Sequence, residues 1–518
     1  MPGDCLTSEI IMQEKPLANN DAGVQKVTII SDRFDPIPIP PRPRNYYTPL
    51  HVAHDVEAVR IKISAVDPHA KINIDGISLL SNQEMEPIRL KIGRNVIQVG
   101  VTARDGTTKK YLALTVFRGY PVPAWTKISG TSPWTPRDSA GELVFNNQMW
   151  LLGGFIPALT NDVWCSDDGI KWIQTGMIPT AKGIDIPVAF VFKDRMWVTD
   201  IEGNLFSSPD GAKWMLVTDR APWKGRQAAG GTVFKGKIWI MGGLQNGKLL
   251  NDIWSSPDGE KWKMETDCAP WPKRQIHNNL MELDNKLWLI GGGIIGSAYH
   301  PFQAYNDVWN SADGVHWEKI VGNAPWTPRI WSSSVVYKDR LWLLGGFRSE
   351  PAWENLGDVW YSADGVNWHQ LTAVPTCRHS GGNNVPVVVA NSIWAPRHES
   401  SAYVFNDAIW MVGGMVWPLV NDVWRLAIPG FTFITEPVVE GYVNALYSYT
   451  TRADFNNSRK PVSYRLIESP EWLTVDLKTG LISGIPPDTG DIQVTVEAGD
   501  ETGETVCQRY TLHILAIT

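Results

Sequence analysis

The chain has 518 residues, of which 43% are hydrophobic and 19% charged, so it is long enough for about three domains with packed cores. The formal net charge of −7 argues against a nucleic-acid partner, because there is no basic excess to neutralise phosphates. The 5 cysteines are scattered and have neither a disulfide framework nor zinc-ligand spacing, so the sequence predicts no metal and no other cofactor.

The N-terminal segment is polar and irregular, and we interpret residues 1–23 as a tail. It lacks the basic start and apolar centre of a secretion signal. No apolar run in the chain reaches the length that a bilayer requires, so the sequence predicts no membrane span.

Residues 24–119 alternate apolar and polar side chains in short runs. Turns separate the runs at Asp75-Gly76, Gly93-Arg94-Asn95 and Asp105-Gly106. This pattern predicts an all-β unit of sandwich type. The passage LKIGRNVIQVGVTARDGTTKKYLALTVFRG resembles the cadherin-like β-sandwich repeat of bacterial surface proteins, which implies a spacer or docking module without catalytic residues.

A short segment recurs through residues 120–430. It contains an apolar run, a turn with Asp-Gly and a second run opened by Trp, which is typical of a tight β-hairpin. The full copies are NDVWCSDDGIKW from Asn161, NDIWSSPDGEKW from Asn251, NDVWNSADGVHW from Asn306 and GDVWYSADGVNW from Gly357. A weaker copy starts at Gly203, and NDVWRL from Asn421 is a half copy. Repetition at this scale predicts an array of supersecondary units.

A second repeat precedes each hairpin and consists of a strand, a two-residue turn and a strand ending in Gly-Gly. Its copies include FNNQMWLLGG from Phe145 and FKGKIWIMGG from Phe234. The two repeats together give four antiparallel strands per unit, as in a propeller blade, and they resemble the kelch family of β-propellers. Counting the copies predicts six blades. The last copy stops at Leu426, so we expect Trp125–Ser129 to supply the missing outer strand and close the ring.

Residues 431–518 return to a strand pattern, and PEWLTVDLKTGLISGIPP resembles an Ig-like, cadherin-like module of surface proteins. The sequence therefore predicts an all-β chain with a six-bladed kelch-type propeller between two β-sandwich domains. Both flanking resemblances imply extracellular or cell-surface modules. Because no signal peptide is visible, a cytoplasmic or non-classically exported protein remains an alternative.

Five arginines occupy equivalent positions in the propeller repeats, each with a Trp three residues before it. They are Arg137, Arg226, Arg274, Arg329 and Arg397. We expect them to converge near the channel mouth, where they could bind a carboxylate or sulfate by charge-assisted hydrogen bonds. The alternative is a scaffold role, in which each Arg stacks on its own Trp and bonds backbone carbonyls.

Departures from the repeat predict the loops that contact a ligand. The step from Trp368 to Arg397 is 29 residues, whereas the equivalent step elsewhere is twelve, and we expect the insertion to lie over the mouth as a lid or specificity loop. The connections 293–305 and 347–356 are also long. Candidate ligand-binding residues in these segments and beside the arginines are Tyr299, His300, Trp331, Arg348, Trp353, Arg378 and His379.

Three titratable residues are candidates for catalysis. His277, His398 and Glu399 closely follow ring arginines, and a His beside Glu could act as general base and acid on a polar small molecule. The structural alternative is that each His is a satisfied loop residue. The Asp of the hairpin is expected in a turn or a blade core. The hairpin also resembles the Asp-box of sialidases, which is structural there too.

Two groups of kelch enzymes suggest specific enzymatic hypotheses for this chain. Galactose oxidase has the same domain order, and the resemblance implies copper ligands for which this chain offers Tyr299-His300 and His513 but no evident Cys beside a Tyr. Sialate mutarotases are six-bladed kelch proteins with a carboxylate-binding Arg cluster, although they lack the flanking sandwiches.

We expect a ligand-recognition protein whose Arg- and Trp-rich mouth binds an anionic small molecule, a glycan or an acidic segment of a partner protein. The alternative is a propeller enzyme acting by His/Glu acid–base chemistry, similar to sialate mutarotases. A copper enzyme similar to galactose oxidase fits the residues less well.

Overall fold

The computed structural model describes residues 21–32, 34–41, 48–296, 301–349, 351–371, 388–389 and 394–516. Within these residues the chain is all-β, and no helix is long and apolar enough to cross a bilayer. The chain divides into two compact units, Met1–Pro121 with Pro375–Asn391, and Val122–Val374 with Ser392–Thr518.

The first unit contains the predicted N-terminal sandwich, whose strands form two sheets. One sheet has the order β2 (Phe34–Pro38), β1 (Val24–Ser31), β4 (Ala58–Ala65), β7 (Ile88–Arg89). The other has the order β32 (Val388–Val389), β3 (Leu50–Val52), β9 (Lys109–Arg118), β8 (Gly93–Thr102), β5 (Lys71–Ile74), β6 (Ile77–Leu80). Alternate residues of β4 are buried, as expected for a strand with one face on a core. Asp75 and Gly76 both have positive φ and form the predicted tight turn between β5 and β6.

The long insertion of the propeller contributes a strand to this unit. Leu50 and His51 of β3 pair in parallel with Val388 and Val389 of β32. The described part of the insertion therefore extends the edge of a sandwich sheet, and the lid over the mouth stays a prediction. Arg378 and His379 lie outside the described residues.

The propeller sheets have the predicted four antiparallel strands, except for the third sheet, which has five. The first sheet contains β11 (Gly141–Phe145), β12 (Gln148–Phe155), β13 (Leu159–Ser166) and β14 (Ile173–Met177). The second contains β15 (Ala189–Phe192), β16 (Arg195–Thr199), β17 (Leu205–Ser208) and β18 (Met215–Thr218). The third contains β19 (Arg226–Gln227), β20 (Gly230–Phe234), β21 (Lys237–Gln245), β22 (Lys248–Ser256) and β23 (Lys263–Thr266). The fourth contains β24 (Leu280–Leu283), β25 (Lys286–Ile294), β26 (Gln303–Ser311) and β27 (Glu318–Val321). The fifth contains β28 (Ser333–Tyr337), β29 (Arg340–Arg348), β30 (Glu354–Ser362) and β31 (His369–Gln370).

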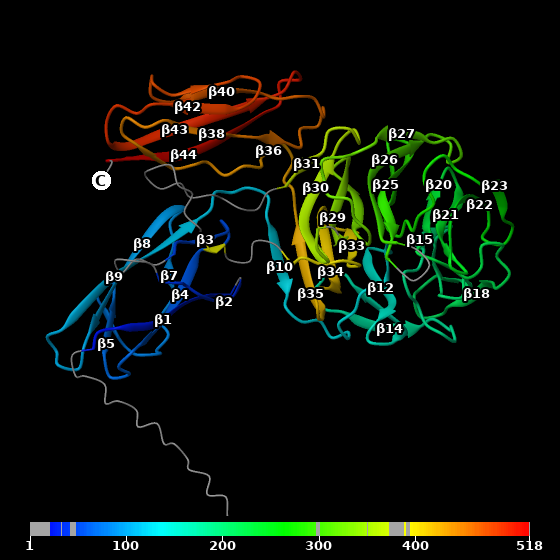
Figure 1. Ribbon diagram of the computed structural model, residues 1–518, viewed down its shortest axis with the longest axis horizontal. Coiled ribbons are helices and arrows are strands. Elements are labelled where there is room, and N and C mark those ends of the chain that lie inside the picture. The colour runs from blue at the N-terminus through cyan, green and yellow to red at the C-terminus, as the bar shows by residue number, and fades with distance from the viewer. Residues whose placement is uncertain are drawn as a thin grey trace, which may run out of the picture. The chain divides into compact units, whose positions relative to one another are not determined.

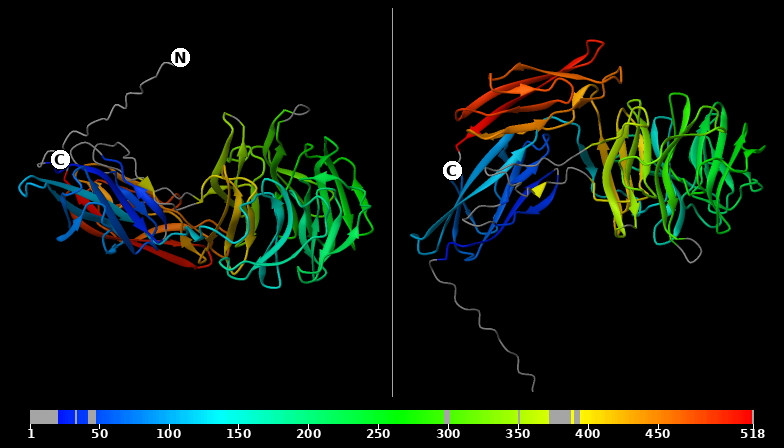
Figure 2. Two further views of the ribbon diagram at one scale, coloured as in Figure 1. Left: turned by 90° about the horizontal axis from the view of Figure 1, so that it is seen from below. Right: turned by 45° about the horizontal axis from the view of Figure 1, so that its top comes forward.

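The closing sheet combines strands from both ends of the propeller. It has the order β10 (Trp125–Ser129), β35 (Leu419–Leu426), β34 (Ile409–Met415), β33 (Ser401–Val404). Trp125 lies opposite Leu426, so the predicted pairing of the WTKIS segment with the last repeat is confirmed (Figure 1). The inner strands adjoin in the order β11, β15, β20, β24, β28 and β33, and β33 adjoins β11 again. The colour of the propeller sheets runs from cyan through green to yellow along the chain (Figure 2).

The repeated arginines lie inside the sheets. Arg274 is fully buried and donates two hydrogen bonds to the carboxylate of Asp307, at 2.6 and 2.8 Å, and a third to the carbonyl of Gly291 at 2.8 Å. Trp309 donates to the same carboxylate at 2.8 Å. We call this arrangement the Arg–Asp clasp. The other four are Arg137 with Asp162, Arg226 with Asp252, Arg329 with Asp358, and Arg397 with Asp422.

The clasps decide between the two alternatives for the arginines. All five side chains are buried and paired with a carboxylate and a Gly-Gly carbonyl, so their guanidinium groups do not converge as free cations. The expected ligand contact by these five residues is therefore wrong, and the scaffold role is favoured. Cation–π contacts of Arg137, Arg329 and Arg397 with the Trp three residues before each belong to the same scaffold.

Each hairpin glycine packs against a Trp of the preceding sheet. A Cβ atom at Gly211 would lie 1.9 Å from the ring of Trp150, and Gly211 has a φ of +75°. Only glycine fits this position, because the ring approaches the backbone too closely for any side chain. The same close approach links Gly169 to Trp410, Gly259 to Trp197, Gly314 to Trp239 and Gly365 to Trp288.

The closing sheet has no hairpin glycine to pack on Trp342 of the fifth sheet, and the C-terminal domain takes that position. Trp342 of the fifth sheet stacks on Phe455, with ring centroids 5.8 Å apart and planes at 3°. Next to it, Asp454 accepts hydrogen bonds from Arg340 at 2.8 Å and from Tyr361 at 2.9 Å. The strands of this domain form three sheets. One pairs β36 (Thr432–Phe433) with β39 (Ala453–Asp454). The second has the order β37 (Glu440–Tyr442), β44 (Thr505–Leu515), β43 (Gly490–Gly499), β40 (Ser463–Glu468), and the third has the order β38 (Tyr447–Thr450), β42 (Leu481–Gly484), β41 (Thr474–Val475).

The Arg–Asp clasp predicts that breaking a buried ion pair lowers the stability of the protein much more than breaking an exposed one. Replacing Asp307→Asn leaves the guanidinium of Arg274 buried without a counter-charge, so we expect the free energy of unfolding to fall by about 3–5 kcal/mol. Denaturant titration measures the change. The control is Lys182→Met, which breaks the exposed pair with Glu202 and is expected to have little effect. Equal losses in the two variants would contradict a structural role for the clasp.

Candidate functional site

Equivalent residues just before the inner strands share an uncommon backbone conformation. Their φ angles are 56° at Ser139, 42° at Ile186, 49° at Ala228, 53° at His277, 56° at Trp331 and 50° at Glu399. Left-handed conformations are unfavourable for such residues and are concentrated at functional sites. Backbone hydrogen bonds join neighbouring sheets here, from Ser139 N to Glu399 O at 3.2 Å and from Glu399 N to Trp331 O at 2.9 Å.

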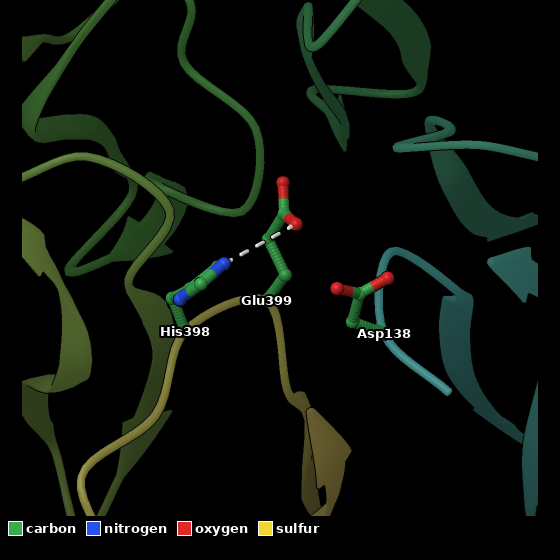
Figure 3. A group of neighbouring side chains, drawn as sticks. All are labelled: Asp138, His398 and Glu399. Carbon is green, nitrogen blue, oxygen red and sulfur yellow. Dashed lines mark ion pairs between the residues drawn. The ribbon is translucent and has the colours of Figure 1, made fainter. Parts of the chain in front are cut away.

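Three titratable side chains meet at this end of the ring. Asp138 leads into β11, and His398 and Glu399 lead into the adjacent β33 (Figure 3). One ligand-type atom from each residue lies within 4.8 Å of the others, and His398 Nε2 is 4.0 Å from Glu399 Oε2. The side chains are only 4–7% exposed. We call these three residues the axial cluster.

The orientation of His398 is fixed from the side opposite Glu399. Its Nδ1 lies 2.6 Å from Asn355 Oδ1, while Asn355 Nδ2 donates to the carbonyl of Met415 at 2.8 Å. Because the amide NH2 is used on Met415, the oxygen of Asn355 accepts and Nδ1 of His398 carries the proton. Burial lowers the pKa of His398 to about 4, so the ring is neutral and Nε2 presents a lone pair.

The carboxyl groups of the axial cluster are not compensated by cations. Burial raises the pKa of Glu399 well above its ordinary value, and the nearby carboxyls of Asp138 and Asp185 raise it further. The pKa of Asp138 is raised to about 6, mainly by burial. Ser139 Oγ lies within 3.1 Å of both Asp138 Oδ1 and Glu399 Oε2, but its single hydrogen can serve only one of them. Among the described residues neither carboxyl pairs with Lys or Arg, and Glu399 Oε1 is buried without a hydrogen-bond partner.

An aromatic strip adjoins the axial cluster. It consists of Phe302, Trp331, Phe347, Trp353 and Trp417. The ring of His398 stacks on Trp331 at 5.2 Å and contacts Phe347 at 5.4 Å and Trp417 at 5.9 Å. Trp353 and Trp417 are 64% and 67% exposed. Large rings this exposed are unusual unless they contact a ligand or partner.

A second polar contact spans the ring further along the inner strands. Asn278, before β24 of the fourth sheet, donates a hydrogen bond to Glu142 on β11 of the first sheet. These sheets are opposite each other in the order of inner strands. Burial raises the pKa of Glu142 to about 8.

The predicted site residues do not all lie together. His398 and Glu399 lie together, with Trp331 and Trp353 in the adjoining aromatic strip. His277 is buried, its ring nitrogens have no hydrogen-bond partner among the described residues, and it is not part of the axial cluster. Arg348 pairs with Glu354. Tyr299 and His300 lie outside the described residues, and His513 pairs with Asp491 of the C-terminal domain at 2.7 Å.

Sequence reasoning missed Asp138, Asn355 and Trp417. Asp138 follows Arg137 directly, just as His398 follows Arg397. Aligning every residue after the ring arginines, rather than only the histidines, would have found it. Asn355 lies near the start of β30 and Trp417 lies between β34 and β35, at positions that no repeat marks.

Comparisons with known proteins agree with the domain organisation. The family model described as DUF6242 beta propeller domain matches residues 123–436, which is more than half of the 518-residue chain. The model of a cadherin-like beta sandwich domain matches residues 26–119, and the He_PIG model of an Ig domain matches residues 431–515. No curated protein matches the chain. A solved structure titled "Structure of YjhT" is 15% identical with a TM-score of 0.45, covering 58% of this chain and 98% of that chain.

The half-buried carboxyl of Glu142 predicts a pH-dependent stability. A folded-state pKa of about 8, above the ordinary glutamate pKa of 4.5, means that the contribution of this carboxyl to stability is present at low pH and is lost as pH rises through about 8. We expect the Tm of the wild type to fall more than that of Glu142→Gln between pH 5 and pH 9.

Thermal unfolding across that pH range measures the difference. Glu282→Gln, at an exposed position of β24, is the control and should follow the wild type. Parallel Tm profiles for the wild type and Glu142→Gln would contradict the burial of this carboxyl as the cause.

Proposed function

Because this chain belongs to the DUF6242 β-propeller family and exposes aromatic rings beside a polar cluster, we propose that it recognises carbohydrate through its propeller. The observation that carries the proposal is the aromatic strip. Exposed Trp faces bind the apolar faces of sugar rings, while nearby hydrogen-bonding groups select their hydroxyls. The Arg348–Glu354 pair, whose members directly follow Phe347 and Trp353 of the strip in the sequence, supplies such groups.

The charges near the strip favour a neutral glycan over an anionic one. The axial cluster contributes carboxyl groups, and the five ring arginines are occupied in their clasps. A sialic acid or an acidic peptide would therefore approach buried carboxyl groups without a free cation from the arginine ring. The flanking cadherin-like and Ig-like domains serve as spacers in this proposal.

We further propose that the propeller is a six-bladed ring of kelch type. The supporting observations are the repeated Gly-Gly strands, the strand order of the closing sheet and the return of the inner-strand order to β11.

A second candidate function is acid–base catalysis on the bound sugar. It is favoured by the proximity of two carboxyls with raised pKa values, Asp138 and Glu399, to a neutral imidazole. Exchange between the anomers of a reducing sugar, followed by NMR, would then be faster with the protein. We expect Glu399→Gln to remove an acceleration of about 10²–10⁴-fold. An exchange rate unchanged by the wild type would leave only the binding function.

The aromatic strip predicts which substitutions weaken glycan binding. We expect Trp417→Ala and Trp353→Ala each to reduce affinity by about tenfold or more, because each removes a large exposed stacking face. A panel of neutral oligosaccharides, sialylated oligosaccharides and acidic peptides identifies the best-bound probe, and calorimetry with that probe measures the affinities.

Tyr111→Ala is a matched control, because Tyr111 is 67% exposed but belongs to β9 of the N-terminal sandwich. It should bind as the wild type does. Preferred binding of acidic peptides, or Trp variants with wild-type affinity, would contradict carbohydrate recognition at the strip.

A further inference from the structure

We propose that the axial cluster is a binding site for a divalent first-row transition metal ion of the Zn²⁺ class, with Asp138, Glu399 and Nε2 of His398 as ligands. Neither the sequence pattern nor the family matches indicate a metal here. The proposal goes beyond carbohydrate recognition and does not depend on it.

The donor atoms are close enough to be gathered by one ion. They lie within 4.8 Å of one another, and His398 Nε2 and Glu399 Oε2 are 4.0 Å apart. Two ligands of a tetrahedral ion with bonds of about 2.1 Å are about 3.4 Å apart. A small rotation of the Glu399 side chain therefore completes the contact, and Figure 3 shows the carboxylates and the imidazole converging from two adjacent sheets.

The charge balance favours a cation at this position. Asp138 and Glu399 are buried together, and Asp185 is near enough for its charge to affect both. The single hydroxyl hydrogen of Ser139 cannot satisfy both carboxyls, and Glu399 Oε1 has no partner while Glu399 is only 7% exposed. Burying an uncompensated carboxylate costs several kcal/mol, and a dication removes this cost for two carboxylates at once.

His398 is already oriented as a metal ligand. The Nδ1 hydrogen bond to Asn355 leaves Nε2 unprotonated on the side of Glu399, which is the arrangement that outer partners impose on metal-binding histidines. Stacking on Trp331 and contact with Phe347 restrict rotation of the ring. Asn355 is therefore a positioning residue for this site, since it acts on the ion only through His398.

The donor set indicates the class of metal. One imidazole nitrogen and two carboxylates suit Zn²⁺ and related ions better than Mg²⁺ or Ca²⁺, which prefer oxygen ligands throughout. Three protein ligands also leave at least one coordination position for water or for another small ligand.

The experiment is metal titration of the full-length chain after treatment with a chelator. Calorimetry with Zn²⁺, Mg²⁺ and Ca²⁺ should show one tight Zn²⁺ site and weaker binding of the other two ions. We expect Asn355→Ala to weaken Zn²⁺ binding by about 10–100-fold, and His398→Ala and Glu399→Gln to weaken it at least as much.

Two control variants separate this site from others. Glu142→Gln removes a different, half-buried carboxyl of the ring and should retain Zn²⁺ binding. The double variant His316→Ala, His513→Ala removes two exposed His–Asp pairs that could bind Zn²⁺ adventitiously, and it should also retain the tight site.

A spectroscopic measurement on the wild type covers the case in which ligand variants fail to fold. Co²⁺ bound with tetrahedral nitrogen and oxygen ligands gives intense visible absorption, and added Zn²⁺ should abolish it. The proposal would be overturned by the absence of a tight Zn²⁺ site, by tighter binding of Ca²⁺ than Zn²⁺, or by a tight site that survives in Asn355→Ala and His398→Ala. Loss of the tight site only in the surface double variant would also overturn it, as an adventitious ion only.

Discussion

The buried ion pair between Arg and Asp within the propeller sheets determines which residues are available for function. In the sheet of Arg274, the guanidinium joins the segment before the inner strand to the Gly-Gly pair of β25 and to the hairpin Asp. A buried pair of this kind is costly to break, because either partner alone would be an uncompensated charge. The repeated arginines therefore hold strands together, and their charges are not available for a ligand.

The sheet in which the repeat is incomplete lacks the glycine contact that joins it to its neighbour, so the ring needs another contact there. The packing of a hairpin glycine on a Trp of the preceding sheet, as for Gly211 on Trp150, joins consecutive sheets. At Trp342 the stacking partner is Phe455 of the C-terminal domain, and Asp454 binds Arg340 and Tyr361 beside it. The Ig-like domain is thus integrated with the propeller through the one joint that the repeats leave unfilled among the described sheets.

The sequence predicted those features that depend on local pattern. The turn at Asp75-Gly76 and the pairing of Trp125 with Leu426 followed from turn chemistry and from the need to close an edge. The destination of Arg137 could not be predicted in this way, because its partner Asp162 lies on another strand and only packing decides which face each side chain occupies. The axial cluster was found in part, since His398 and Glu399 are adjacent in sequence whereas Asp138 comes from the other end of the repeat array.

The residues proposed for function depart from the repeat and lie at the end of the ring where the inner strands begin. There, Asp138, His398 and Glu399 are proposed to form a metal site. The most direct measurement is X-ray diffraction from crystals grown with Zn²⁺, recorded on both sides of the zinc absorption edge. We expect an anomalous peak between these three side chains, within bonding distance of His398 Nε2. Zinc peaks only at exposed pairs such as His513 and Asp491, with none at the axial cluster, would contradict it.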